Sequence, residues 1–322
     1  MTVCNILLVG MNKGGVGKSH VCLNLGTLFA SGLANKGKSK KPKKVLLVDL
    51  DPQANLSDQV INIARNIKDD FEQDIGDVRV MLEENNFAMS YELITQAVTD
   101  EEEFEILDRQ LFRPSQDLEL YCLIGKGKDA TAYHEAKNDS PIEVAARMRN
   151  RLDALIEKEG FDLVIIDSPP GETQVEMLAS MHVCSDLLIP ANWNDGSSSG
   201  LQTMAEIVKA VREERLLNGD DLNIAGILMN LAPQSKEQRD FSAHIEKRFP
   251  IFASRVLSTA LYRYQPWEKC SNGGILPWEP SKLMAKPLRT SITSSLRHVA
   301  FELQENMSAG YEYADIDDSK VG

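Results

Sequence analysis

A glycine-rich stretch near the start of the chain, MNKGGVGKSH at residues 11–20, carries two lysines where a phosphate-binding loop needs one. Its glycines let backbone N–H groups turn toward phosphate oxygens without a Cβ in the way. Lys18 is placed to reach the β- and γ-phosphates of a nucleotide, and Ser19 to offer its hydroxyl to Mg²⁺. The strict pattern G-x-x-x-x-G-K-[ST] is missed, because Asn12 stands where its first glycine belongs. The stretch therefore predicts a nucleotide site of altered type, and Lys13 needs an explanation of its own.

Two apolar runs further along the chain end in aspartates. FDLVIID ends at Asp167, and VLLVDLD ends with Asp49 and Asp51. Parallel strands bring their carboxyl ends to one edge of a sheet, where α/β proteins bind ligands. A carboxylate at that edge can reach Mg²⁺ through water, which makes Asp51 and Asp167 candidate metal residues. Asp49 could instead cap a turn or a helix, and this alternative remains open at this stage.

These residues require strands to carry them, and the chain contains nearly continuous apolar runs of suitable length. Such runs are typical of buried parallel strands that helices cover on both faces. The runs occupy residues 3–10, 44–50, 161–167, 186–191 and 223–230. Helix-length segments with helical periodicity alternate with them, at 18–31, 142–158 and 200–217. The alternation predicts an α/β fold with a doubly wound, mostly parallel sheet.

Composition narrows the class of protein. The net charge is −13, and hydrophobic residues make up 43% of the chain, enough to bury a substantial core. The five cysteines form no CxxC pair and are interpreted as small buried side chains of a reducing compartment. No apolar run approaches the roughly 18–20 residues of a membrane span, and no signal peptide is recognisable. We therefore expect a cytoplasmic protein.

The chain is expected to form one main domain over residues 1–301. Residues 56–117 are polar and acidic with helical spacing, and they are predicted to be a helical insertion packed on that domain. Residues 302–322 are expected to be an acidic, disordered tail. The basic segment 35–44 is interpreted as a solvated connection away from the nucleotide, with a DNA contact as the alternative.

Together these motifs resemble the ParA/Soj-type partition ATPases, within a class that includes MinD and the nitrogenase iron protein. KGGVGKS is similar to the deviant Walker A loop of that class, VLLVDLDPQAN to its first switch, and FDLVIIDSPPG to its second. The DPQ element is the most specific and favours ParA over its relatives. The resemblance implies a P-loop NTPase fold. Because the first predicted strand begins at about residue 3, the helix-turn-helix domain of longer family members is expected to be absent.

The resemblance also explains the second lysine. In the class, this lysine crosses a dimer interface, so Lys13 of one subunit would contact phosphates bound by the other. Asp51 would orient the attacking water, and Asn230 would read the adenine. His20 departs from the usual threonine, which removes a hydroxyl contact. The catalytic set is Lys13, Lys18 and Asp51; the nucleotide set is Lys13, Gly14, Gly15, Val16, Gly17, Lys18, Ser19, His20 and Asn230; the metal set is Ser19, Asp51 and Asp167.

The resemblance implies that ATP and Mg²⁺ close a homodimer that binds DNA without sequence preference. A ParB-like activator would stimulate an otherwise slow hydrolysis, and the ATP-bound form would lie on the nucleoid while plasmid or chromosomal DNA is partitioned. The composition of residues 241–300 supports DNA binding, because this segment has nine Lys and Arg residues but three Glu, and non-specific DNA binding depends on neutralising phosphates. The DNA-binding candidates are Arg263, Lys282, Lys286, Arg289 and Arg297.

Other functions of the same switch remain open. A ParA-like ATPase could position a non-DNA cargo, such as conjugation machinery or a protein cluster. A MinD-like membrane switch is disfavoured, because the acidic C-terminal segment carries the wrong charge for an anionic membrane. A redox carrier like the nitrogenase iron protein would need paired cysteines near the nucleotide switch, and Cys122 and Cys184 do not match that context.

Overall fold

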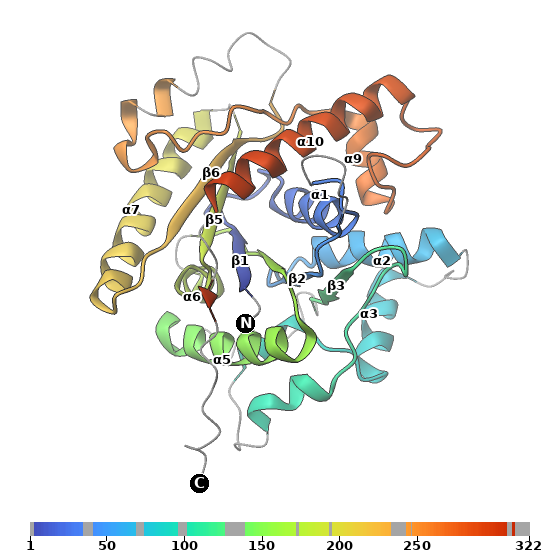
Figure 1. Ribbon diagram of the computed structural model, residues 1–322, viewed down its shortest axis with the longest axis horizontal. Coiled ribbons are helices and arrows are strands. Elements are labelled where there is room, and N and C mark those ends of the chain that lie inside the picture. Colours follow the sequence, from blue (N-terminus) through green and yellow to red (C-terminus); the bar gives the residue numbers. More distant parts are fainter. Residues whose placement is uncertain are drawn as a thin grey trace.

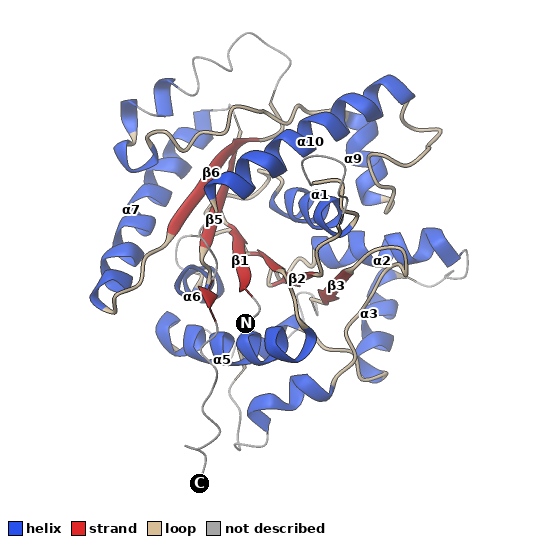
Figure 2. Ribbon diagram, in the orientation of Figure 1, coloured by secondary structure: helices blue, strands red, loops and turns tan. Residues whose placement is uncertain are grey.

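A central β-sheet with helices on both faces organises the chain (Figures 1 and 2). The computed structural model describes residues 3–34, 41–68, 74–95, 102–125, 139–171, 174–192, 195–232, 243–245, 247–307 and 311–312. The sheet order is β3-β2-β4-β1-β5-β6, and every pairing along this path is parallel. The strands are β1 Val3–Val9, β2 Val45–Asp49, β3 Leu120–Leu123, β4 Leu163–Asp167, β5 Asp186–Ala191 and β6 Asn223–Met229. The predicted doubly wound α/β fold is confirmed.

The helices divide between the two faces of the sheet. Apolar side chains of α5, α6 and α7 pack on one face, and those of α1, α2 and α10 pack on the other together with residues of α9. The α-helices are α1 Lys18–Ala30, α2 Asn55–Lys68, α3 Ile75–Glu84, α5 Pro141–Glu159, α6 Val175–Val183, α7 Asp195–Leu217, α9 Gln265–Asn272 and α10 Lys286–Asn306. Short 3-10 helices span Ser90–Leu93, Glu102–Asp108 and Pro250–Phe252.

Alternation of side chains along the strands explains the continuous apolar runs. In β1, Ile6 and Leu8 join the core beneath α5, α6 and α7, whereas Leu7 and Val9 join the core beneath α1 and α10. Successive residues of a strand point to opposite faces, so a strand covered on both sides must be apolar at every position. Helix α1 packs closely on β2, because a Cβ added to Gly26 would come within 2.7 Å of the Leu47 side chain.

The segment 56–117 differs from the predicted insertion. It begins inside α2, which packs on α1 as part of the layer that covers the sheet, and it leads into the edge strand β3. It is therefore the crossover connection between two neighbouring parallel strands. β3 has four residues, LYCL, which is too short a run to stand out from its polar surroundings.

The C-terminal boundary also differs. Helix α10 continues to Asn306 and buries Leu303, so the expected boundary after residue 301 falls inside the helix. The spacing of Leu296, Val299 and Leu303 continues one apolar face past that boundary. Beyond it, β7 (Tyr311–Glu312) pairs antiparallel with the start of β1, and the rest of the expected tail lies outside the described residues.

Three features of the composition can be compared with the structure. The five cysteines are all buried and free, as predicted. Of the basic segment, residues 41–44 lead into β2 at the end of the sheet opposite Asp49, and residues 35–40 lie outside the described part. Within the described ranges, no helix combines the length and apolar content that crossing a membrane would require.

Candidate nucleotide site and basic groove

Three strand ends meet at one edge of the sheet. Val9 at the end of β1 and Asp49 at the end of β2 are both aligned with Asp167 at the end of β4. The glycine-rich loop follows β1 directly, so it leaves the sheet beside these two carboxylates. The predicted convergence of the loop and the strand-end aspartates is therefore confirmed.

The loop is open to a ligand. Gly15 and Gly17 adopt φ angles of 76° and 81°, in the left-handed region that favours glycine. A Cβ built on Gly14 or Gly15 would meet no other atom within 4 Å. Within the described part of the chain, the amides of Gly14, Gly15 and Gly17 donate no hydrogen bond to the protein. Helix α1 begins here without an acidic residue in its first turn, so its positive end is available to an anion.

Lys18 is a buried cation. Its side chain is 6% exposed, and its ammonium donates to the carbonyl oxygen of Lys13 at 3.4 Å. Burial lowers the pKa of Lys18, while the charges of Asp167 and Asp51 oppose that shift. Lys18 forms no ion pair with any described residue. A buried ammonium beside unpaired backbone amides is suited to bind phosphate.

The surroundings of Asp167 show whether the site fits a metal ion. It is fully buried, and neither carboxyl oxygen accepts a hydrogen bond of normal geometry from the described residues. Burial raises the pKa of Asp167 well above its usual range, and Asp49 adds to the effect, whereas Ser19 and Lys18 oppose it. No group of three or more potential His, Cys, Asp or Glu ligands gathers in the described ranges. Ser19 and Asp167 therefore fit Mg²⁺ that takes its remaining ligands from nucleotide phosphates and water.

Asp49 and Asp51 shape the turn that leads into α2. The carboxylate of Asp49 accepts hydrogen bonds from the amide and hydroxyl of Ser57, at 2.8 and 2.7 Å, and from the amide of Asp51 at 3.2 Å. Burial raises the pKa of Asp49 to about 7. Asp51 is 6% exposed and accepts from the amide of Gln53 at 2.9 Å. The capping role that was left open for Asp49 is the one that the structure shows, and Ser57 is a partner that sequence reasoning missed.

Asn230 and His20 contact other parts of the protein through their side chains. Asn230 donates to the carbonyl of Val16 at 2.8 Å, and a Cβ on Gly17 would lie 2.6 Å from the same amide nitrogen. Asn230 thus holds the phosphate loop, and its role toward adenine stays a prediction. The imidazole of His20 packs edge-on against Trp267, with ring centroids 4.5 Å apart. Burial lowers the pKa of His20 to about 4, so the ring is neutral at physiological pH.

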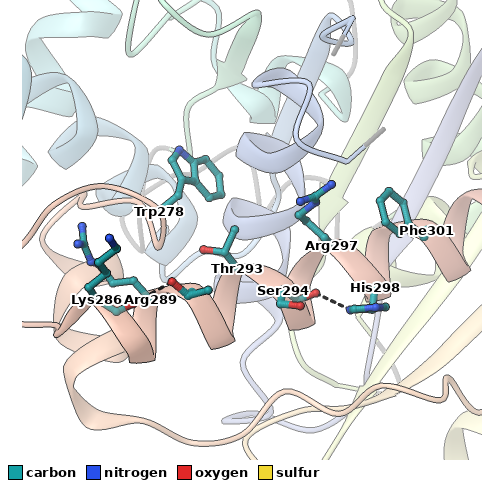
Figure 3. A pocket seen from close by; sticks show the side chains of 9 residues that line it. Trp278, Lys286, Arg289, Thr293, Ser294, Arg297, His298 and Phe301 are labelled. Carbon is teal, nitrogen blue, oxygen red and sulfur yellow. Dashed lines mark hydrogen bonds between the residues drawn. The ribbon is translucent and has the colours of Figure 1, made fainter. Parts of the chain in front are cut away.

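A groove of about 580 Å³ runs along the outer face of α10 (Figure 3). Figure 3 shows Trp278 facing the helix from the preceding loop, with the side chains of Arg297 and Phe301 further along. Arg297 stacks over the ring of Phe301 at 5.7 Å. The groove is lined by Trp278, Lys286, Arg289, Thr290, Thr293, Ser294, Arg297, His298 and Phe301.

The structure brings three of the five DNA-binding candidates together in this groove: Lys286, Arg289 and Arg297. None of them pairs with a carboxylate among the residues that the structure describes. Lys282 is exposed but does not line the groove, and Arg263 is 65% exposed and paired with Glu268 at 3.0 Å. The result is an apolar and hydroxyl-bearing groove with unneutralised positive charge, which suits an anionic partner.

Comparisons with known proteins agree with this geometry. Residues 4–224 match the family described as AAA domain. The chain is 27% identical over 226 residues to the sporulation initiation inhibitor protein Soj of Bacillus subtilis, covering 70% of this chain and 72% of Soj. Its fold is similar to that of a Cyanothece McdA variant in complex with ATP, with a TM-score of 0.65, 19% identity, and coverage of 97% and 100% of the two chains. The fold is also similar to that of a putative plasmid partition protein of Borrelia burgdorferi bound to AMPPNP, with a TM-score of 0.58 and 14% identity. The match covers 92% of this chain and 97% of that protein.

Proposed function

Since this chain belongs to the AAA-domain family and is a ParA/Soj-type ATPase, we propose that it is an ATP-dependent dimerising switch that binds DNA without sequence preference and partitions plasmid or chromosomal DNA. The observation that carries the proposal is the groove along α10, where Lys286, Arg289 and Arg297 lie together without carboxylate partners. A chain with a net charge of −13 can attract DNA only through such a local cluster of cations.

The nucleotide site supports the switching part of the proposal. Lys18 and the open amides of the loop would hold the phosphates, and Lys13 of the second subunit would add a cation where charge develops during phosphoryl transfer. Asp51 would orient the attacking water. When bound, Mg²⁺ would neutralise phosphate charge, with Ser19 and Asp167 as its protein partners. A site completed by a second subunit is slow alone, and a ParB-like activator bound to the cargo would accelerate it.

Retention on a random-sequence DNA duplex, measured with ADP and with ATP and Mg²⁺ across a salt series, tests the function. We expect the protein to be retained on DNA with ATP and Mg²⁺ but not with ADP. If a dimer places six groove cations on phosphates, log affinity should fall with log salt with a slope of about −5. Arg289→Ala, which removes two cations from the dimer, should reduce that slope by about 2. A dimer that binds no DNA in either nucleotide would reject the proposal and direct the search toward a membrane or protein matrix.

Arg263→Glu is expected to abolish DNA retention and to leave ATP affinity unchanged. The substitution reverses an exposed charge and places it beside Glu268, the present partner of Arg263. Arg212→Glu is the matched control, because Arg212 is also ion-paired on the surface, with Asp221 at 2.6 Å, but is not among the DNA-binding candidates. Retention of DNA by Arg263→Glu at the wild-type level would remove Arg263 from the binding surface.

Asp51→Ala is expected to trap an ATP-bound dimer. The variant would lose the carboxylate that orients water while Lys18 and the loop amides still hold the phosphates. Gel filtration with light scattering after prolonged incubation with ATP should show a dimer that persists, whereas the wild-type dimer decays as ATP is consumed. Turnover at the wild-type rate would contradict the role of Asp51.

A further inference from the structure

Helix α9 touches the helix that begins at the phosphate loop. Trp267 of α9 is 2% exposed, and its ring meets the imidazole of His20 at a centroid distance of 4.5 Å and an interplanar angle of 61°. His20 lies two residues after Lys18, in the first turn of α1. A displacement of the first turn of α1 on nucleotide binding would therefore reach α9 through two large, buried rings.

The other end of α9 is held by α2. Gln59 donates through its side-chain amide to the side chain of Asn272 at 3.2 Å, and Asn62 donates to the carbonyl of Asn272 at 2.9 Å. Asn66 donates to the carbonyl of Gly273. The three donors lie three and seven residues apart, on one face of α2, and they satisfy acceptors that the end of α9 leaves open.

Gly274 brings the two backbones into direct contact. Its φ is +71°, and a Cβ at this position would lie 2.3 Å from the carbonyl carbon of Asn62 and 2.4 Å from the amide nitrogen of Ile63. At this point α2 and the turn after α9 are therefore in contact through backbone atoms, with no side chain between them. Since packed interiors deform little, a shift of α2 must move this turn or break the contact.

Helix α2 starts at the predicted switch. Ser57 in its first turn is hydrogen-bonded to Asp49, and Asp49 also accepts from the amide of Asp51. The carboxylate of Asp51 thus lies in the same turn that fixes the start of α2. Both elements that face the nucleotide, the loop before α1 and the turn before α2, are therefore connected to α9.

On its outer side, α9 holds Arg263. Glu268, in the first turn of α9, pairs with the guanidinium of Arg263 at 3.0 Å. We propose that α9 is the relay through which ATP binding repositions Arg263 and so controls DNA binding, with His20, Trp267 and the α2 contact at Gly274 as its positioning residues. The part of this inference that links α9 to DNA binding rests on the proposed function. The part that links nucleotide binding to α9 does not depend on DNA.

Gly274→Ala tests the relay, because it separates α2 from the turn after α9. Gly219→Ala is the matched control: its φ is +75°, so it has the same backbone strain, but its Cβ would meet nothing within 4 Å. We expect Gly274→Ala to bind ATP within about threefold of wild type. The ratio of DNA affinity in ATP to that in ADP should fall at least about tenfold, whereas Gly219→Ala keeps the wild-type ratio. If Gly274→Ala does not fold, the double variant Asn62→Ala and Asn66→Ala is the alternative test. It removes two hydrogen bonds without a clash and should also reduce the ratio of DNA affinity in ATP to that in ADP.

Hydrogen exchange of residues 265–272 in ADP and in ATP, without DNA, separates the relay from the proposed function. The expected result is a difference between the two nucleotides in the wild type that is lost in Gly274→Ala or in the paired asparagine variant. Identical exchange of α9 in both nucleotides, or a full response in these variants, would overturn the relay. If the wild type retains no DNA but α9 responds to ATP, the relay stands and the DNA-binding proposal fails.

Discussion

Replacing Lys18 with alanine is expected to weaken ATP binding at least 100-fold, about 2.7 kcal/mol. The ammonium of Lys18 is buried and forms no ion pair within the described residues, so an anionic phosphate is its natural partner. A charge-assisted hydrogen bond to phosphate contributes roughly 1.5–3 kcal/mol, and the lysine would reach more than one phosphate. Isothermal titration calorimetry with ATP and Mg²⁺ measures the loss directly.

The same variant should fold normally without nucleotide. Burial lowers the pKa of Lys18, which means that the charged ammonium is destabilised in the absence of phosphate, so alanine should not reduce the melting temperature of the nucleotide-free protein. Lys209→Ala is the control, because that side chain is 71% exposed and pairs with Glu213. ATP affinity within about threefold of wild type would show that Lys18 does not contact the phosphates.

Lys13→Ala is expected to keep ATP binding in the monomer but to lose dimerisation and hydrolysis. Lys18 contacts the backbone carbonyl of Lys13, so the substitution leaves that hydrogen bond in place and removes only the side-chain cation of Lys13. A cation supplied in trans to the transferring phosphoryl group is worth about 1,000-fold or more in rate. Light scattering with a slowly hydrolysed ATP analogue and a steady-state ATPase assay measure the two losses.

Mixing the Lys13→Ala and Lys18→Ala proteins examines the trans arrangement more directly. A mixed dimer can contain one complete site, in which the first subunit binds ATP and the second supplies Lys13. Activity that appears only on mixing would therefore place Lys13 across the interface. A Lys13→Ala protein that dimerises and hydrolyses ATP at the wild-type rate would contradict the assignment.

The strands around the site were predictable because burial on both faces leaves a strong signal. β1, β2 and β4 are nearly continuous apolar runs, and the glycine-rich loop follows β1 while aspartates end β2 and β4. β3 was missed for the opposite reason, since four residues at the edge of the sheet leave too short a pattern. The acidic tail was predicted to begin at residue 302, although α10 continues to Asn306, because the acidic composition after residue 301 obscured the apolar spacing that ends at Leu303.

The sequence by itself determined the glycine-rich loop, the strand-end aspartates and the alternation of strands and helices. These depend on backbone freedom at glycines and on periodicity, which neighbouring residues set locally. The position of Asp49 at the start of α2 and the shared face of Lys286, Arg289 and Arg297 on α10 depend on short separations in the chain, whereas the tertiary structure alone decided that Asn230 holds the loop. It also decided that α9 lies against His20 and Gly274 meets α2. Those contacts join segments that are far apart in the chain, so they exist only once the sheet has ordered the helices on its two faces.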